Sequence, residues 1–258
     1  MGIEEAVDYL RKITQERIEF EKDDFVEFDR REKGEIYAID GSSVKLFDAY
    51  SFSVYARRTG YVFANERKIL ERGIEEIKID FIFAENADAI NDERREAEEI
   101  AIAEKLSGSL VLMDGCLKEK KDGIIGISKK SGLKDGNIPL LFLIKKFGDK
   151  IMPDKCWYYE IDDGIYAVKF HPYSRFAFRV DYFGNDVEDV FAEIAAFCND
   201  VSCIGYPYAL AEVHKLVKIG REDAEYLKYS LLHNAIQKGM SMEELEDLFY
   251  DYHEYLEG

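Results

Sequence analysis

Two aspartates in this sequence follow apolar runs of the same kind. Residues 36–39 and 110–113 are short apolar segments, and each is followed by an Asp-Gly pair, at Asp40 and at Asp114. An aspartate at the end of a buried strand costs stability unless a partner compensates its charge. If the two strands are neighbours in one sheet, the carboxylates lie close together and require a cation. Mg²⁺ and Mn²⁺ prefer carboxylate oxygens, so the pattern predicts a divalent metal site.

The Asp-Gly pairs have a second interpretation. Glycine lets the chain turn sharply and would leave each carboxylate at an open rim, but Asp-Gly is also common in turns without a function. The P-loop and the G-x-G-x-x-G, G-x-S-x-G and H-E-x-x-H patterns are absent from the sequence. Nucleotide-driven motors and the common hydrolase classes therefore find no support.

The elements that must hold these aspartates are indicated by hydrophobic periodicity. The pattern predicts strands at 35–39, 51–56, 60–64, 76–84, 109–113, 123–128, 156–161, 165–170 and 176–183. It predicts helices at 3–33, 91–106, 139–147, 187–198, 208–219 and 221–255. This order favours a mixed α/β sheet flanked by helices. We expect a single domain over 1–258, with a core at about 34–220 and helical extensions at 1–33 and 221–258.

Composition narrows the class of protein. The net charge is −18, and 47% of the residues are hydrophobic, which favours a folded chain with a large core. The apolar run at 138–144 is shorter than the ~20 residues of a membrane helix. Without a signal pattern at its start, the chain is expected to be cytoplasmic and to have no membrane partner. The charge excludes a generally basic nucleic-acid coat, but it allows a local basic groove or acidic metal ligands.

Four segments occur in the order found in the NurA nucleases. They are AIDGSS at 38–43, a glutamate-rich helix at 92–106, VLMDGCL at 111–117 and GYPYALAEVHKLVKI at 205–219. The chain thus resembles this family over roughly 36–219. The resemblance implies an RNase H-like core, a homodimer, and a DNA nuclease that depends on Mn²⁺ or Mg²⁺. It also implies 5′–3′ exonuclease and single-strand endonuclease action in DNA end resection, with HerA, a hexameric ATPase, as partner.

The resemblance also assigns roles to acidic residues. Asp40 and Asp114 match the two catalytic aspartates, which the resemblance makes ligands of one or two Mn²⁺ or Mg²⁺ ions. The third acidic ligand lies on the helix between them, where Glu96, Glu98 and Glu99 are all available. Glu98 is favoured, because its place after the paired arginines looks like the helix of the family.

A late histidine and a tyrosine complete the site that the resemblance implies. His214 matches a histidine that binds metal or carries a proton, and Tyr206 matches a tyrosine that would orient a phosphate or a metal-bound water. From the residues alone, His214 lies between Leu210 and Val217 on an expected helix. A buried histidine that is satisfied within the core is the other interpretation of that position.

The positions of several basic side chains predict a groove that binds DNA. Five of them are candidates for phosphate contacts: Lys129, Lys130, Lys169, Arg175 and Arg179. Aromatic residues interleave with them in segment 166–179, which suits stacking on unpaired bases. Alternating aromatics are also typical of a core strand, and exposed Lys and Arg are typical of an ordinary soluble surface.

Two other functions remain open from the sequence. The first is a catalytically silent scaffold or protein-binding module, because the acidic segment 241–258 has an apolar stripe beside its charged face. The second is an RNase of the same architecture, because no residue pattern in the sequence shows whether the protein recognises the 2′-hydroxyl group that distinguishes RNA from DNA.

Overall fold

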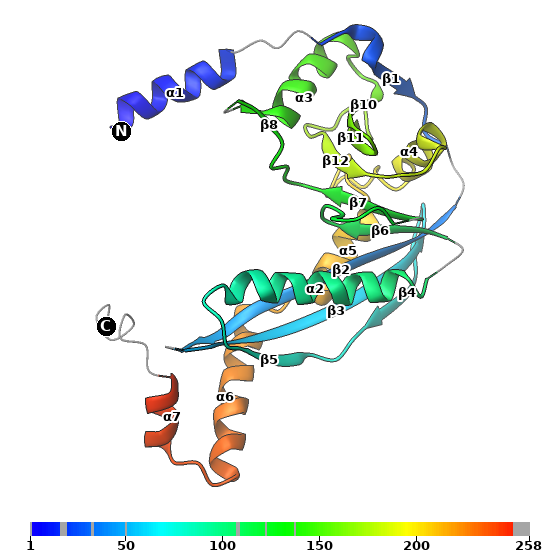
Figure 1. Cartoon of the computed structure of the whole chain (residues 1–258). Coiled ribbons are helices and arrows are strands. Elements are labelled where there is room, and N and C mark those ends of the chain that lie inside the picture. Colours follow the sequence, from blue (N-terminus) through cyan, green and yellow to red (C-terminus); the bar gives the residue numbers. More distant parts are fainter. Residues whose placement is uncertain are drawn as a thin grey trace. The chain divides into compact units, whose positions relative to one another are not determined.

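The protein is described here by a computed structural model that covers residues 2–15, 20–31, 34–49, 51–106, 109–121, 123–136 and 138–249. A ten-stranded sheet has the order β1-β10-β11-β12-β7-β6-β2-β3-β4, and β5 also pairs with β3 (Figure 1). Its strands are β1 (Phe25–Phe28), β2 (Glu35–Asp48), β3 (Ser53–Asn65), β4 (Ile69–Ile74), β5 (Lys78–Ile82), β6 (Leu110–Asp114), β7 (Ile124–Ser128), β10 (Cys156–Asp162), β11 (Ile165–Lys169) and β12 (Phe178–Asp181). A separate two-stranded sheet pairs β8 (Lys134–Asp135) with β9 (Ile138–Pro139).

The sheet is mixed, as the sequence predicts. β6 and β7 are parallel, whereas β10, β11 and β12 form antiparallel pairs. The helices are α1 (Ile3–Gln15), α2 (Ala87–Ala103), α3 (Leu140–Ile151), α4 (Val187–Ala195), α5 (Tyr208–Val217), α6 (Arg221–Gln237) and α7 (Met242–Phe249), with a 3₁₀ turn at Lys22–Asp24. The prediction of a mixed sheet flanked by helices is therefore confirmed. Among the described residues, no helix combines the length and the apolar character needed to cross a bilayer.

The chain forms two compact units, each assembled from three stretches of sequence. Unit 1 contains Met1–Ala38, Phe63–Leu70 and Gly108–Ala211. Unit 2 contains Ile39–Val62, Glu71–Ser107 and Glu212–Gly258. The strands β2 and β3 each contribute residues to both units. The expectation of one domain over 1–258 stays a prediction.

Strand β10 shows how the core of unit 1 is built. Successive residues of a strand point to opposite faces of the sheet. Trp157 is fully buried in a cluster with Phe25 and Ile144, which brings α3 against one face. The ring of Tyr158, next in sequence, meets Phe191 of α4 edge-on, with 5.4 Å between ring centroids. Helices α3 and α4 therefore cover opposite faces of this part of the sheet.

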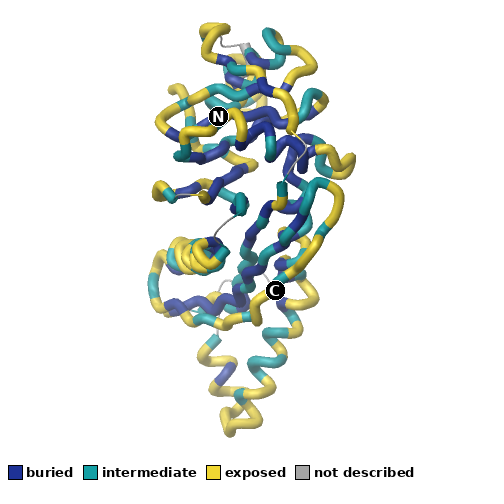
Figure 2. The backbone as a smooth tube through the Cα atoms, turned by 90° about the vertical axis from the view of Figure 1, so that its right-hand side faces the viewer, coloured by how far each residue is buried: buried dark blue, intermediate teal, exposed yellow. Residues whose placement is uncertain are grey.

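In unit 2, strand β3 likewise packs against helices on both faces of the sheet. Val54 and Ala56 are buried in a cluster that includes Ala224 of α6. Tyr55, between them in sequence, packs instead with Ala87 at the start of α2. Figure 1 shows α2 lying along these strands, and Figure 2 shows that α6 and α7 are mainly exposed or half-buried beyond their contact with the sheet. Burial on both faces explains why β3 is apolar at the three consecutive positions 54–56, near its start.

Two predicted helices differ in the structure. The expected helix at 3–33 ends at Gln15 in the described part, and Phe25–Phe28 form β1 because Phe25 and Phe28 are buried in unit 1. The expected helix at 221–255 is two helices, α6 and α7. Gly239 lies between them with φ +100°, a left-handed conformation that ends a helix and suits glycine. Residues 250–258 lie outside the described residues.

The predicted turn after Asp40 is also wrong. Strand β2 continues through Asp40 and Gly41 to Asp48. Gly41 is needed there for another reason, because a Cβ atom at this position would lie 2.5 Å from Oε1 of Glu99. The glycine thus lets α2 approach the strand closely. Asp114 fits the prediction better, since β6 ends there and Gly115 follows with φ +138°.

Candidate metal centre

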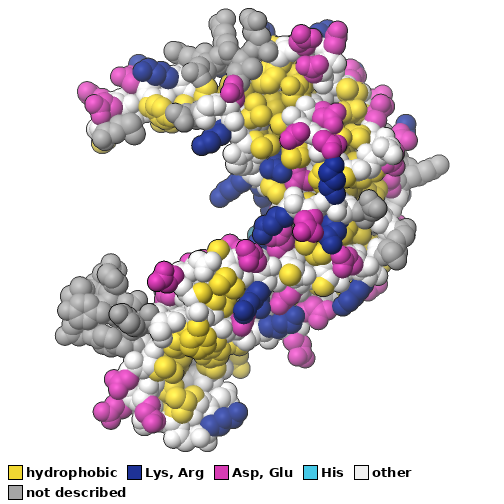
Figure 3. All heavy atoms as spheres, in the orientation of Figure 1, with side chains coloured by type: hydrophobic (Ala, Val, Ile, Leu, Met, Phe, Trp, Pro, Cys, Tyr) yellow, Lys and Arg dark blue, Asp and Glu magenta, His cyan; other side chains and the backbone are white. Residues whose placement is uncertain are grey.

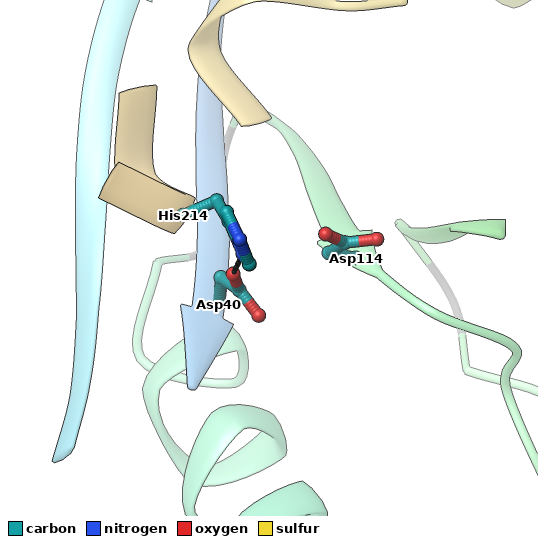
Figure 4. Close-up of side chains that lie close together, drawn as sticks. All are labelled: Asp40, Asp114 and His214. Carbon is teal, nitrogen blue, oxygen red and sulfur yellow. Dashed lines mark hydrogen bonds and ion pairs between the residues drawn. The ribbon is translucent and has the colours of Figure 1, made fainter. Parts of the chain in front are cut away.

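Asp40 is a buried carboxylate in the middle of β2. The residue is 4% exposed, and its Oδ1 accepts a hydrogen bond of 2.8 Å from the backbone N–H of Gly41. Its Oδ2 lies 2.8 Å from Nδ1 of His214 on α5 (Figure 4). A buried carboxylate requires such partners, because removal from water is costly for a charge. The contact also fixes the orientation of the imidazole, whose side chain is 55% exposed.

Helix α2 brings one glutamate against the Asp40 segment. Glu99 is 2% exposed and lies beside Gly41, and its Oε1 accepts a hydrogen bond of 2.6 Å from Nη1 of Arg95. Burial opposes the charge on Arg95, but nearby Glu99, Asp92 and Asp40 raise the pKa of its guanidinium above the ordinary value. Asp40 and Glu99 therefore both act on the guanidinium of Arg95, which balances part of their negative charge.

Glu98, the residue favoured from the sequence, belongs to a different cluster. Its Oε1 lies 3.3 Å from Nη2 of Arg57 and 3.4 Å from Nζ of Lys78. Arg57 is 5% exposed and also pairs with Asp80 at 2.8 Å. Glu98 thus compensates a buried arginine. The structure brings Glu99 to the segment of Asp40, and it does not bring Glu98 there.

The sequence contained a signal for Glu99 that depends on where the helix begins. The buried residues of α2 are Ala87, Asn91, Glu99 and Ala103, which are separated by multiples of four. This spacing marks one face of a helix. Asn91, where the expected helix begins, lies inside α2, and its Nδ2 donates a hydrogen bond of 3.0 Å to Oγ of Ser43 on β2. A helix that begins at residue 87 indicates Glu99 as the buried glutamate.

Asp114 ends β6, next to the parallel strand β7. Nζ of Lys129 lies 2.5 Å from Oδ2 of Asp114, and the same Nζ lies 4.9 Å from the ring centroid of Tyr206. Tyr206 is 6% exposed, and its ring packs on Phe178. Tyr206 therefore forms a rigid support beneath Lys129, while Lys129 balances the charge of Asp114.

The residues expected to hold a metal come together on adjacent strands. β6 is next to β2 in the sheet. One ligand atom from each of Asp40, Asp114 and His214 lies within 4.8 Å of those of the other two (Figure 4). Two carboxylate oxygens and an imidazole nitrogen are a donor set that suits a divalent ion such as Mn²⁺ or Mg²⁺. These side chains thus fit the metal that the resemblance implies.

The five candidate DNA-binding cations have different environments. Lys169 is 4% exposed and its Nζ lies 2.7 Å from Asp149, so it is an internal ion-pair partner. Burial opposes the charge of Asp149, but Lys145 and Lys169 hold the pKa of its carboxyl below the usual value. Arg179 lies 2.7 Å from the fully buried Asp181. Lys129, Lys130 and Arg175 are exposed, and only these three present their charge to a ligand.

The fold around this centre is that of a known class of nuclease structures. The chain aligns with the crystal structure of the NurA nuclease from Sulfolobus solfataricus at a TM-score of 0.68 and 16% identity, covering 93% of this chain and 95% of that chain. A second NurA crystal structure aligns at 0.66 and 13% identity, covering 89% and 95%. No family model matches the sequence, and no curated protein matches it. The fold expected from the NurA resemblance is therefore confirmed.

Proposed function

We propose that this protein is a member of the NurA family and a divalent-metal-dependent nuclease. The observation that carries the proposal is the group of Asp40, Asp114 and His214 within a NurA fold. Such a group is a minimal ligand set for a hydrolytic metal ion, and phosphodiester hydrolysis is a reaction for which proteins commonly use one or two such ions. The motifs at 38–43, 111–117 and 205–219 support the same family.

Asp40, Asp114 and His214 are the proposed ligands, and Glu99 joins them as the acidic residue of α2. When bound, a divalent ion would polarise the phosphate and activate a water molecule. Asp40 holds the imidazole of His214 through Nδ1, as carboxylates often orient ligating histidines. Lys129 supplies a cation next to Asp114 for a phosphate oxygen, and Tyr206 supports that lysine.

The finer proposal concerns substrate and partners. We propose DNA as the substrate, with 5′–3′ exonuclease and single-strand endonuclease action in DNA end resection. The partner would be a HerA-type hexameric ATPase, because the sequence itself has no P-loop. We also propose that the chain forms a homodimer and acts in the cytoplasm. The NurA resemblance supports each part of this finer proposal. Co-purification with a HerA-type ATPase and light scattering of the purified chain test the partner and the dimer.

A silent scaffold is the second candidate, and one observation favours it. Lys129 already pairs with Asp114, and His214 already contacts Asp40. The carboxylates are thus partly compensated without an ion. Thermal melting separates the two candidates, because an ion that binds only the folded state stabilises it by about 2.7 kcal/mol at one hundred times its Kd. A nuclease melts at higher temperature with Mn²⁺, whereas a scaffold does not respond.

The decisive experiment measures cleavage of linear DNA with Mn²⁺ by the variants Asp40→Asn and Asp114→Asn. Loss of a ligand removes several kcal/mol of transition-state stabilisation, so we expect rates to fall roughly 100-fold or more. Asp163→Asn is the matched control, because Asp163 is an exposed aspartate whose side chain pairs with Lys120. It should keep the full rate. Wild-type rates in both site variants would refute the proposed site. If the wild-type protein digests a matched RNA faster than the DNA, the substrate is RNA and not DNA.

A further inference from the structure

A pocket of about 570 Å³ lies in unit 1 beside Lys129. Its wall is mainly aromatic and cationic: Lys129, Tyr173, Arg175, Phe176, Phe178 and Tyr206. Ala177 and the segment 202–204 complete the lining. Pockets of a few hundred cubic ångströms with apolar walls and a few convergent polar groups are typical of small-ligand sites. Its volume suits one flat heterocyclic ring with a sugar attached.

Two aromatic side chains at this pocket are exposed. Tyr173 is 74% exposed and Phe176 is 64% exposed, whereas Phe178 and Tyr206 are buried and form the floor. Burial of an aromatic side chain is favourable by about 1.5–3 kcal/mol, so exposed rings that face a cavity are available to a ligand. The alternative from the sequence, that these aromatics all belong to the core, therefore holds for Phe178 and not for Tyr173 or Phe176.

The loop that carries the exposed rings is held in one conformation. Oγ of Ser174 donates to the carbonyl oxygen of Phe176 at 2.8 Å and accepts from its N–H at 3.1 Å. The N–H of Tyr173 donates to Nδ1 of His171 at 3.1 Å. Ser174 also packs on Gly205, where φ is +87° and a Cβ atom would lie 2.2 Å from Oγ of Ser174. The rings are thus preorganised, which lowers the entropic cost of binding.

The charged side chains around the pocket indicate what kind of ligand it binds. Arg175 is exposed between the two aromatic residues, and Lys129 belongs both to the pocket wall and to the ion pair with Asp114. A ligand with an apolar flat face and attached anionic groups matches aromatic walls with cations at the edge. A nucleobase with its neighbouring phosphates has this chemistry, because every base has a π-face that stacks on an aromatic ring.

We propose that this pocket binds one unpaired nucleobase of the substrate strand, next to the phosphate that is cleaved. Phe176 and Tyr173 stack on the base, and Arg175 contacts an adjacent phosphate. A paired base is covered by its neighbours, so the pocket selects single strands or extruded bases. The inference rests on the proposed nuclease function for the phosphate, but the stacking itself requires no metal.

Metal-free binding tests the proposal on the full chain in the presence of EDTA. A labelled single-stranded DNA oligonucleotide is titrated with wild type, Phe176→Ala, Phe176→Trp and Tyr173→Ala, and fluorescence anisotropy gives the Kd. Loss of one stacked base is expected to raise Kd roughly 5- to 100-fold for Phe176→Ala, while Phe176→Trp keeps the affinity. Phe83→Ala is the matched control, because Phe83 is 71% exposed in unit 2. It should change the Kd less than twofold.

An abasic oligonucleotide separates stacking from a general loss of structure. Wild type should bind it as weakly as Phe176→Ala binds the ordinary strand, and Phe176→Ala should lose nothing further. An unchanged Kd for Phe176→Ala, or equal losses in wild type and variant with the abasic strand, would overturn the proposal. If Phe176→Ala cleaves DNA and binds it as well as wild type does, only the proposed base pocket is refuted. Base-dependent binding without Mn²⁺-dependent cleavage refutes only the nuclease.

Discussion

At the scale of single residues, the structure separates two adjacent glutamates, of which the family resemblance favours Glu98. Glu98 and Glu99 are one position apart, which turns their side chains by about 100° around the helix axis. Glu99 is buried beside Gly41, and Glu98 pairs with Arg57. Each glutamate thus has its own arginine, since Glu99 pairs with Arg95 beside the Asp40 segment and Glu98 pairs with the buried Arg57 on the other side of the helix surface.

This difference predicts opposite effects for two conservative variants. Glu99→Gln should lower Mn²⁺-dependent cleavage at least roughly 10-fold and reduce the Mn²⁺-induced rise in melting temperature, because it removes a candidate ligand charge. Glu98→Gln should leave cleavage within about twofold but destabilise the fold by about 1–3 kcal/mol, because Arg57 loses one of its carboxylates. Chemical denaturation and cleavage rates measure both. The reverse pattern would make Glu98 the ligand.

The sequence could predict that Asp40, Asp114 and His214 lie together, but not which glutamate is buried beside the Asp40 segment. Asp40 and Asp114 each follow an apolar run, but only β6 ends at its aspartate, because β2 continues beyond Asp40 to Asp48. The glutamate depends on the register of α2, which begins at Ala87 and not at Asn91. Asn91 resembles a helix cap locally, but its amide instead bonds Ser43 on β2. Only a tertiary contact decides this register, so residue types alone do not reveal it.

At the scale of elements, the packing of α2 against β2 depends on one glycine. Ala at position 41 would place a Cβ atom 2.5 Å from Oε1 of Glu99, 3.0 Å from Cγ of Arg95 and 3.1 Å from Cγ2 of Thr59. Glu99 is buried in its ion pair with Arg95, so it has little space to move. The sequence suggested a turn at Gly41, because a glycine required by helix packing and a glycine required by a turn look identical in a sequence.

Gly41→Ala is therefore expected to destabilise the protein by about 1–3 kcal/mol through overpacking, and to lower cleavage by displacing Glu99. Gly132→Ala is the control, because no atom lies within 4 Å of a Cβ at that position. Urea denaturation and Mn²⁺-dependent cleavage measure the two effects. A Gly41→Ala protein with unchanged stability and activity would mean that α2 does not pack this closely on β2 in solution.

At the scale of the whole molecule, acidic residues outnumber basic ones, and several basic side chains are used within the protein. The chain has 35 Lys and Arg residues against 53 Asp and Glu, and Figure 3 shows both kinds of charge intermixed on one face, with apolar side chains on α6 and α7. Lys169 and Arg179 illustrate this use, because both are held by buried or half-buried aspartates. An acidic protein of this kind gains little from long-range attraction to DNA and depends on a few local cations.

The salt dependence of single-stranded DNA binding measures how many Lys and Arg side chains contact phosphates. Each phosphate contact contributes roughly 0.7 to the slope of log K against log salt, so contacts from Lys129, Lys130 and Arg175 give a slope of about −2, while all five candidates would give about −3.5. Arg175→Met and Lys130→Met should each reduce the slope by roughly 0.7. Lys169→Met should leave the slope unchanged and cost about 1–3 kcal/mol of stability, because Asp149 loses its buried partner. A slope near −3.5 that falls with Lys169→Met would mean that Lys169 leaves Asp149 to bind a phosphate.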